Sequence, residues 1–419
     1  MLPARLRCIR CGTTFPATEH TNACRSCAPQ VAAALTLDAN HELSGVSKDS
    51  LATGVNSMWR YEHTLPVARA HAITLGEGMT PLIPLHHLGA DFGLPELYAK
   101  CEFANPTGSF KDRLASSAIS SARDLFDARV IATSSTGNAG AAAAAYAAKA
   151  GIDCIIFTTA SASGPIVAQM QAYGATVVAT PTKADRWRLL KQGVERFNWF
   201  PTSPFFAPPI GSNPFGVEGY KTLAYEIAQD FGWSSPDWIV LPVCYGDALY
   251  GMWKGFRELL DMGWIDRIPR FVAAEIYGSL SAAYVTGDDT LPIMEQPYET
   301  AATSITSPQG TYQSLTVVRS SEGLPIRVQE DELRSARRLI SRKEGLYVET
   351  AAAATIAATQ RLAEDNIIGH DQKVVCLLTA GGLKEMPIDP DENPVIQVPA
   401  DLEEMIKLIR EQTGRILSK

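Results

Sequence analysis

The 419-residue sequence has no apolar run approaching the roughly 20 residues that a helix needs to span a membrane. The stretch from Met1 to Cys8 also lacks the apolar core of a signal peptide. Basic residues are in deficit, because 37 lysines and arginines stand against 45 aspartates and glutamates, for a formal charge of -8. Such a charge argues against a nucleic-acid or anionic-membrane partner. We therefore expect a cytoplasmic protein with neither kind of partner.

Nothing else in the composition is extreme. Hydrophobic residues make up 46% and charged residues 20% of the chain, as in ordinary globular proteins. A chain of this length can form two or three domains and a sizeable core.

Four of the eight cysteines form two C-x-x-C pairs separated by a twelve-residue spacer: Cys8, Cys11, Cys24 and Cys27. Each pair can present two thiolates to one ion, so the spacing predicts a zinc ribbon. Four sulfur ligands leave no open position for a substrate, so the zinc would be structural. The alternatives are two disulfides or four idle thiols. The other cysteines lie in apolar segments and are expected to be reduced core or near-core residues: Cys101, Cys154, Cys244 and Cys376.

Most of the remaining chain alternates strands and helices. In the first half, the pattern predicts strands at Arg129 to Thr133, Asp153 to Thr158 and Ala175 to Thr180, and helices at Ala141 to Ala150, Pro165 to Tyr173 and Ala184 to Phe197. In the second half, it predicts helices at Val217 to Asp230, after Gly251 through Leu260, Asp331 to Lys343 and Ala351 to Ala363, and strands at Trp238 to Val243, Arg270 to Ile276 and Lys373 to Thr379. Such repeats favour right-handed βαβ units on parallel sheets. The fold class is therefore α/β.

Two further segments bear on how the chain is divided. Phe200 to Pro214 is rich in Pro, Phe and Ser, which suits a crossing between domains, and Ala400 to Leu417 reads as a terminal amphipathic helix. We expect a ribbon at residues 1–30, a large domain from residues 31–104 and 211–419, and a small α/β domain at residues 105–210.

Lys111 lies just after an apolar strand, Leu97 to Phe103, and a turn of Asn, Pro, Thr and Gly. The turn chemistry predicts a helix that begins at Ser109, with Asp112 as its capping-box partner. A cation in the first helical turn opposes the helix dipole, so the position favours a neutral or covalently bound amine. A neutral lysine is a nucleophile. The alternative is an ordinary solvated lysine.

Three small-residue turns follow predicted strands: Ser134 to Gly140, Cys244 to Gly251 and Thr379 to Gly382. Backbone N–H groups in such turns bind anions, and ligands of open α/β sheets bind at the carboxyl ends of strands. The three turns therefore suit a cofactor that carries a phosphate.

The stretch Asn105 to Arg113, NPTGSFKDR, resembles the cofactor-lysine motif of the threonine synthases, which are fold-type II enzymes that use pyridoxal phosphate (PLP). WRY…LP, from Trp59 to Pro66, and LGEG-x-TPL, from Leu75 to Leu82, resemble threonine-synthase segments as well. The resemblance implies two open parallel-sheet domains with the cofactor in the cleft between them, and a homodimer. It also implies that Lys111 holds PLP covalently and moves protons at the α and β carbons of an amino-acid substrate.

The resemblance also implies roles for other residues. Asn138 would contact the 3′-oxygen of PLP, and the Thr379 hydroxyl would face the pyridine nitrogen. The phosphate cup would be formed by Val243, Cys244, Tyr245, Gly246, Asp247 and Ala248. Substrate would be bound by Ser134, Ser135, Thr136, Gly137, Ser212 and Asn213. Phe110 and Asp112 would serve packing and capping, and Arg113 would close an ion pair.

Several positions depart from the family pattern. Cys244 stands where glycine is usual, and Asp247 is a carboxylate in an expected anion site. Gly216 replaces the arginine that contacts the substrate's phosphate, and Tyr220 replaces a glutamine. The segment that begins at Glu349, ETAAAA, resembles E-P-A-S-A-A with its serine lost.

The activity that the resemblance names is conversion of O-phosphohomoserine to threonine and phosphate. The alternative is a related lyase or β-replacement enzyme that uses a hydroxy- or O-substituted amino acid, which the change at Gly216 favours. A further alternative is a zinc-ribbon binding protein whose α/β body does no chemistry. Retention of Lys111, Asn138 and Thr379 argues against this last alternative.

Overall fold

The computed structural model describes residues 5–17, 23–27, 31–38, 46–52, 54–160, 162, 164–296, 299–385, 395–398 and 400–414. The chain forms two units, Met1–Glu385 and Met386–Lys419. The second unit contains the helix α14 (Leu402–Thr413), whose first turn is capped by the Asp401 side chain. Among the described residues, no helix combines the length and the apolar character that crossing a membrane requires.

The first sheet is a small antiparallel one at the N-terminal end of the chain. Its order is β2-β1-β3, with bounds β1 (Arg5–Cys8), β2 (Thr14–Pro16) and β3 (Leu35–Asp38). Leu6, Leu35 and Leu37 pack together with Phe215, which lies much later in the same unit. The sheet includes β3, which follows the predicted ribbon of residues 1–30 in the sequence. Residues 28–30 lie outside the described residues.

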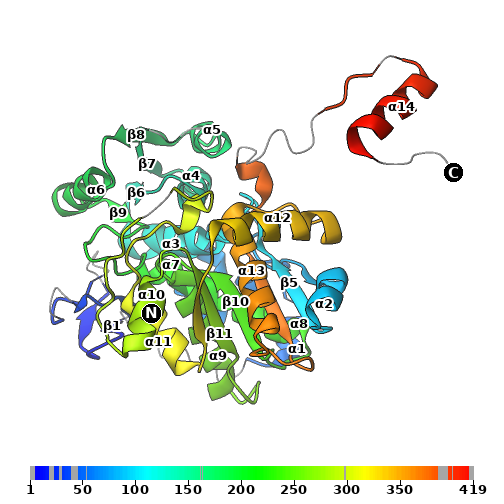
Figure 1. The fold of residues 1–419 in the computed structure, drawn as a ribbon. Coiled ribbons are helices and arrows are strands. Elements are labelled where there is room, and N and C mark those ends of the chain that lie inside the picture. The colour runs from blue at the N-terminus through cyan, green and yellow to red at the C-terminus, as the bar shows by residue number, and fades with distance from the viewer. Residues whose placement is uncertain are drawn as a thin grey trace. The chain divides into compact units, whose positions relative to one another are not determined.

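A four-stranded parallel sheet follows, with the order β8-β7-β6-β9. Its elements are β6 (Val130–Ser134), α4 (Asn138–Ala150), β7 (Asp153–Thr159), α5 (Pro165–Ala172), β8 (Thr176–Thr180), α6 (Lys183–Phe197) and β9 (Phe200–Pro201). Ile131 and Ile156 pack toward the alanines of α4, whereas the neighbouring Ala132 and Phe157 pack toward α6. The two-residue alternation of the strands therefore places helices on both faces of this sheet (Figure 1).

The largest sheet has six strands in the order β12-β11-β10-β13-β5-β4. Their bounds are β4 (Leu82–Pro84), β5 (Leu97–Cys101), β10 (Trp238–Pro242), β11 (Arg270–Glu275), β12 (Leu324–Arg327) and β13 (Val374–Leu378). All pairs are parallel except β4 with β5, so the sheet carries one antiparallel edge strand.

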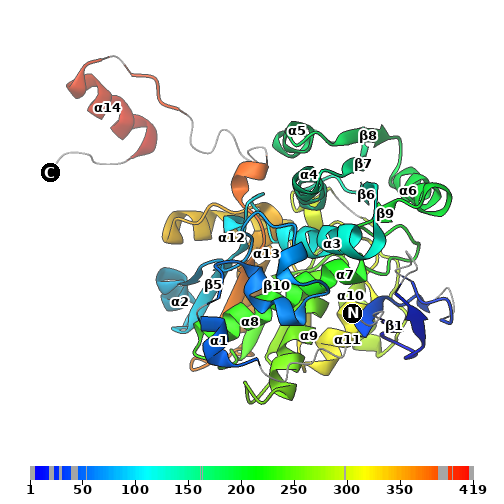
Figure 2. The same ribbon diagram turned by 180° about the vertical axis from the view of Figure 1, so that it is seen from behind.

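Helices also cover both faces of the large sheet, which Figures 1 and 2 show from opposite sides. One face packs against α8 (Lys221–Asp230), α9 (Asp247–Asp261), α10 (Ser279–Thr286) and α11 (Tyr312–Ser320). The other face packs against α2 (His86–Phe92), α12 (Glu330–Glu344) and α13 (Thr350–Glu364). The α/β fold class is therefore confirmed, and the limits of the domains stay a prediction.

The remaining helices are short. They are α1 (Lys48–Ala52), α7 (Pro214–Val217) and 3-10 turns at Met58–Thr64, Arg69–His71, Glu102–Ala104, Glu218–Tyr220, Thr303–Ile305 and Gly382–Lys384. The helix predicted from Val217 to Asp230 is thus wrong in its first part, because α7 and a 3-10 turn precede α8 there.

The helix α3 (Lys111–Phe126) is tied to the large sheet by a buried ionic network. Arg113 lies 2.8 Å from a Glu102 carboxylate oxygen and 2.6 Å from one of Glu226, and all three side chains are fully buried. Lys100 approaches the same Glu226 at 3.1 Å. The prediction that Arg113 closes an ion pair is confirmed.

Candidate active site

Lys111 is the first residue of α3, and the chain reaches it through a tight turn. Gly108 has a φ of 80°, a conformation that favours glycine. The predicted capping box of Ser109 and Asp112 is wrong. The Asp112 carboxylate instead accepts hydrogen bonds from the Thr107 hydroxyl at 2.7 Å and the Thr107 N–H at 3.2 Å. Asp112 therefore fixes the turn before the helix and does not cap the helix.

The Lys111 amine faces aromatic rings. Its Nζ donates to the Tyr220 hydroxyl at 3.3 Å and lies 4.1 Å from the centroid of the Phe110 ring, which stacks on Tyr220. Loss of water around the amine lowers the pKa of Lys111, while the Asp247, Cys244 and Glu349 side chains raise it in part. The site thus favours the neutral, nucleophilic form that the sequence predicted.

The turn between β6 and α4 carries the predicted carboxylate-binding loop. The Ser135 hydroxyl accepts hydrogen bonds from the Gly137 N–H at 3.1 Å and the Gly140 N–H at 3.0 Å, which closes the loop. Ser134 Oγ is buried and has no hydrogen-bond partner, and Thr136 is exposed at the tip. Helix α4 begins at Asn138 rather than at Ala141, which places Asn138 in its first turn.

Glu349 joins two of the predicted cofactor residues. Its Oε2 accepts from Asn138 Nδ2 at 2.8 Å, and its Oε1 accepts from the Thr379 hydroxyl at 3.4 Å and from the Ser304 hydroxyl at 3.3 Å. Burial, together with the nearby Glu385 carboxylate, raises the pKa of Glu349 to about 7, against the opposing effect of Asn138. Because Glu349 also acts electrostatically on Lys111, the structure brings Lys111, Asn138 and Thr379 into one site.

The predicted phosphate cup lies at the N-terminus of α9. Gly246 has a φ of 77°, and a Cβ there would lie 2.0 Å from Ser314 Oγ, so only glycine fits. The Asp247 carboxylate is held by three hydrogen bonds. It accepts from the Ser212 N–H at 2.8 Å, from Ser212 Oγ at 2.6 Å and from Gln313 Nε2 at 2.9 Å. The first N–H groups of α9 remain available for an anion by helix geometry.

Other members of the predicted cup have different environments. Val243 and Ala248 are buried, whereas Cys244 and Tyr245 are partly exposed. Burial raises the pKa of Cys244 to about 11, and the Lys183 and Lys111 amines lower it in part. Cys244 therefore lies within electrostatic reach of two amines.

The α7 segment packs closely against α3. The Asn213 side chain caps α7 through its oxygen, which accepts from Phe215 N–H at 2.9 Å, and its nitrogen donates to the Pro201 carbonyl at 2.8 Å. A Cβ on Gly216 would lie 2.8 Å from Leu114 Cγ and 3.2 Å from Ala118 Cβ on α3. The position therefore has no room for an arginine unless α3 moves.

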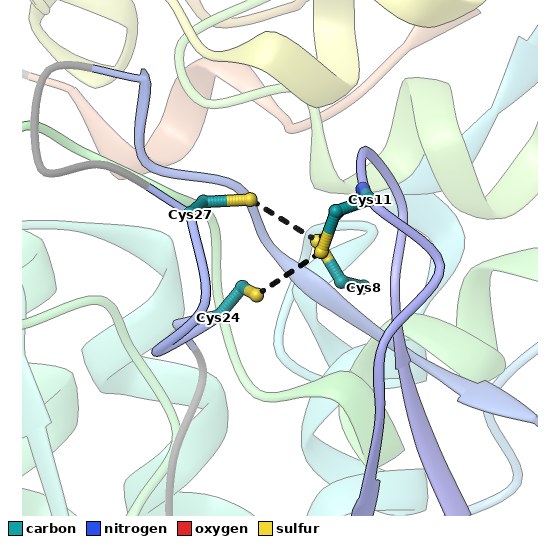
Figure 3. Close-up of side chains that lie close together, drawn as sticks. All are labelled: Cys8, Cys11, Cys24 and Cys27. Atoms are coloured by element: carbon teal, nitrogen blue, oxygen red, sulfur yellow. Dashed lines mark hydrogen bonds between the residues drawn. The ribbon is translucent and has the colours of Figure 1, made fainter.

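The four cysteines of the ribbon come together as predicted. All four Sγ atoms lie within 4.8 Å of one another, with Cys8 to Cys27 at 3.7 Å and Cys11 to Cys24 at 3.6 Å (Figure 3). Zinc–sulfur bonds of about 2.3 Å in a tetrahedron require sulfur atoms roughly 3.8 Å apart. The donor set therefore fits a structural zinc ion.

The residues around Lys111 fit PLP. The cofactor needs an amine, an anion site for its phosphate and polar partners for its ring. Lys111 and the N-terminus of α9 offer the first two. Asn138 Oδ1 and Ser134 Oγ are buried polar atoms without hydrogen-bond partners, and such atoms normally find a ligand or water.

The sequence did not predict a functional role for two residues near Lys111, namely Tyr220 and Glu349. Each appeared in the sequence only inside a motif that departs from the family pattern. Glu349 carried one sequence signal, an acidic residue directly before a helix of small residues, but its carboxylate does not cap α13 and accepts from Asn138 instead.

The chain is similar to known proteins over most of its length. A family model described as a pyridoxal-phosphate dependent enzyme matches residues 73–380. The threonine synthase of Methanocaldococcus jannaschii is 33% identical over 415 residues, which cover 97% of this chain and 99% of that protein. The threonine synthase of Halalkalibacterium halodurans is 35% identical over 343 residues, which cover 78% of this chain and 91% of that protein.

Solved structures share the fold at lower identity. Maize serine racemase superposes with a TM-score of 0.63 at 22% identity and covers 73% of this chain and 89% of its own. A processed threonine deaminase isoform from Solanum lycopersicum has a TM-score of 0.63 at 18% identity and covers 81% of this chain and 88% of its own. At these identities the likeness is one of fold.

Proposed function

This chain belongs to the family of pyridoxal-phosphate-dependent enzymes that includes the threonine synthases, and on that premise we propose that it converts O-phosphohomoserine and water to threonine and phosphate. Membership makes the chain a PLP-dependent lyase, so the alternative of a non-catalytic zinc-ribbon protein is dropped. The observation that carries the proposal is the desolvated Lys111 amine, which shares one site with Asn138, Thr379 and Glu349. A homodimer and a cytoplasmic location remain expectations.

When bound, PLP supplies an electron sink that stabilises negative charge on the substrate carbon next to the amino group. Lys111 would hold the cofactor and then move protons at the α and β carbons. The lowered pKa of Lys111 favours this proton transfer, because a general acid or base works best when its pKa is near the ambient pH. The Tyr220 hydroxyl, 3.3 Å away, orients the amine. Burial raises the pKa of Tyr220 well above its usual value, so this partner stays neutral.

The remaining residues would orient the two reactants. The loop from Ser134 to Gly137 would bind the substrate carboxylate through N–H and hydroxyl groups, and Thr379 would offer a neutral partner to the ring nitrogen. A neutral partner moderates the electron sink, which suits elimination and replacement better than transamination. Phe110 covers the amine and helps to exclude water. Ser212 is held by Asp247 beside the proposed phosphate cup, and Asn213 follows it at the cap of α7.

A second activity is favoured by one observation, the packing of Gly216 against α3. The α7 segment offers no cation for a substrate phosphate at this position. A lyase or β-replacement enzyme that uses a hydroxy- or O-substituted amino acid would not need one. We retain this activity as the alternative.

The test begins with visible absorption. The purified protein supplied with PLP should show a visible band that Lys111→Ala loses and that Lys149→Ala, an exposed lysine on α4, retains. Release of inorganic phosphate from O-phosphohomoserine is then compared with product formation from serine, threonine and their O-substituted forms. Turnover of O-phosphohomoserine supports threonine synthase, and turnover of only the others supports the alternative. A protein that stays colourless with PLP contradicts both.

A further inference from the structure

Helix α6 presents two cations beside the candidate site. The helix begins just after β8 and is capped by Thr182, whose hydroxyl accepts from the Asp185 N–H at 3.1 Å. Lys183 and Arg186 are three positions apart, so they lie on the same face of the helix. The carboxyl ends of parallel strands share one edge of a sheet, so this helix start lies on the same edge as the loop after β6.

Arg186 is a buried cation without a partner. The residue is 7% exposed, and its guanidinium makes no hydrogen bond or ion pair with any residue in the described part of the chain. Its Nε is fully buried and unpaired. A buried guanidinium normally has an acidic or hydrogen-bonding partner, because the loss of its hydration is otherwise not compensated. An anionic ligand would supply that partner.

Lys183 places the pair next to the phosphate-cup loop. Its Nζ lies 5.7 Å from the ring centroid of Tyr245 and 5.7 Å from that of Trp187. The Lys183 side chain is exposed, yet crowding around the amine lowers its pKa, as does Arg186. Lys183 and Lys111 both act on the Cys244 thiol, so the α6 cations and the reactive amine lie on the same small region.

The nearby carboxylates do not neutralise these cations by direct contact. Asp185 accepts hydrogen bonds from Thr182 and from Arg188, which lies 3.0 Å away. Asp247 is held by Ser212 and Gln313. The face of α6 that carries Lys183 and Arg186 therefore keeps its positive charge, and the dipole of a 15-residue helix adds to it.

We propose that Lys183 and Arg186 bind the phosphate of the amino-acid substrate, which makes them specificity-determining residues. This inference rests on the proposed function, in which a phosphate leaves the substrate. A phosphate monoester carries about two negative charges and three acceptor oxygens. It therefore suits a site with a guanidinium and an ammonium better than a ligand with a single carboxylate would. α6 then supplies the positive charge that Gly216, packed against α3, has no room to provide.

A phosphate at this place has a second possible source, the cofactor itself. The start of α9 is the better site for the cofactor phosphate, because Gly246 and the free N–H groups of the first turn lie there. The experiment therefore measures cofactor binding and substrate binding separately.

The test uses the PLP-loaded enzyme and three variants, Lys183→Gln, Arg186→Gln and the matched control Lys191→Gln. Lys191 is exposed on the same helix and pairs with Glu195 at 3.7 Å. Inorganic phosphate binding is measured by calorimetry, KM and kcat are measured with O-phosphohomoserine, and PLP affinity is measured by absorption titration. Homoserine, which lacks the phosphate, is the reference ligand for spectral binding.

We expect each of the first two variants to weaken inorganic phosphate binding and to raise KM at least about tenfold, the effect of one lost charged contact. PLP affinity and homoserine binding should change less than about twofold in the same variants. Arg186→Lys should recover part of the loss. Because Lys183 is exposed, Lys183→Gln tests the inference even when Arg186→Gln does not fold.

Unchanged phosphate binding in Lys183→Gln overturns the inference. A loss of PLP affinity with unchanged KM also overturns it, because the cations would then serve the cofactor. Phosphate binding that depends on both cations in an enzyme that does not turn over O-phosphohomoserine supports the anion site and contradicts only the named substrate. The two proposals thus fail in distinguishable ways.

Discussion

The side-chain amide of Asn138 donates a 2.8 Å hydrogen bond to the carboxylate of Glu349, 211 residues later in the sequence. The bond links the first turn of α4 to the start of α13 and so connects elements on the two larger sheets. Glu349 is 3% exposed and also accepts from Thr379. A carboxyl group with its pKa raised to about 7 is therefore shared by the residues proposed to contact the cofactor ring.

The first prediction concerns the pH dependence of stability at Glu349. Its pKa rises from an ordinary 4.5 to about 7 on folding, so the folded state binds the proton more tightly. The resulting stabilisation is complete below pH 4.5 and is lost as pH rises through 7. We expect the unfolding free energy of the wild type, relative to Glu349→Gln, to fall by about 3 kcal/mol across this window. Urea titrations of both proteins across the window measure it, and a constant difference would contradict it.

The second prediction concerns the buried ionic network. Arg113→Ala leaves Glu102 and Glu226 buried without their partner and should destabilise the fold by about 3–5 kcal/mol. Arg129→Ala is the control, because Arg129 is 84% exposed and pairs with Asp127 on the surface. Its denaturation midpoint should match the wild type. Equal midpoints for the two variants would show that the network contributes no more than a surface pair.

Elements with a strong pattern were predictable from the sequence. The strand expected at Asp153 to Thr158 is β7 (Asp153–Thr159), and the helix expected at Ala184 to Phe197 is α6 (Lys183–Phe197). β9 and β12 were missed because they have two and four residues, too few to show a period. Their positions are set by pairing with neighbouring strands, which local sequence does not encode.

The candidate site likewise contains features that local sequence predicts and features that depend on tertiary structure. Lys111 could be identified because its signal is local: the stretch NPTGSFKDR around it resembles the cofactor-lysine motif of the threonine synthases. The partnership of Asn138 with Glu349 depends on tertiary structure, so no window of sequence contains it. Arg186 was hidden for another reason: a charged residue on an amphipathic helix is usually solvated, and only the fold shows that this one is buried.

The third prediction concerns the zinc ribbon. Cys24→Ser removes one of four clustered sulfur ligands and should abolish the binding of about one zinc ion per chain. Cys154→Ser is the control, since Cys154 is also buried but lies alone on β7. Metal analysis of the purified proteins makes the comparison. Retention of zinc by Cys24→Ser would contradict the four-sulfur site.

The fourth prediction concerns Gly216. Restoring the family arginine with Gly216→Arg should not restore a phosphate contact, because even a Cβ would lie 2.8 Å from Leu114 Cγ. We expect it to destabilise the protein by at least about 2 kcal/mol through overpacking against α3. The same substitution at Gly369, which is exposed and has ordinary contacts, should be tolerated. Thermal denaturation distinguishes the two, and a Gly216→Arg protein with normal stability and a lower KM would contradict the packing argument.

The last prediction concerns the charge that Asp247 places near Lys111. Loss of water lowers the pKa of Lys111, and Asp247 is the strongest influence that raises it. Capture of PLP requires the neutral amine, so its rate in cofactor-free protein should rise with pH through this pKa. In Asp247→Asn the attraction that stabilises the protonated amine is gone, while Cys244 and Glu349 remain. The rise should therefore move to lower pH. The growth of the visible band after mixing with PLP measures it, and Asp261→Asn, an exposed position at the other end of α9, is the control. A shift to higher pH, or an equal shift in the control, would mean that Asp247 does not act on the amine as the geometry implies.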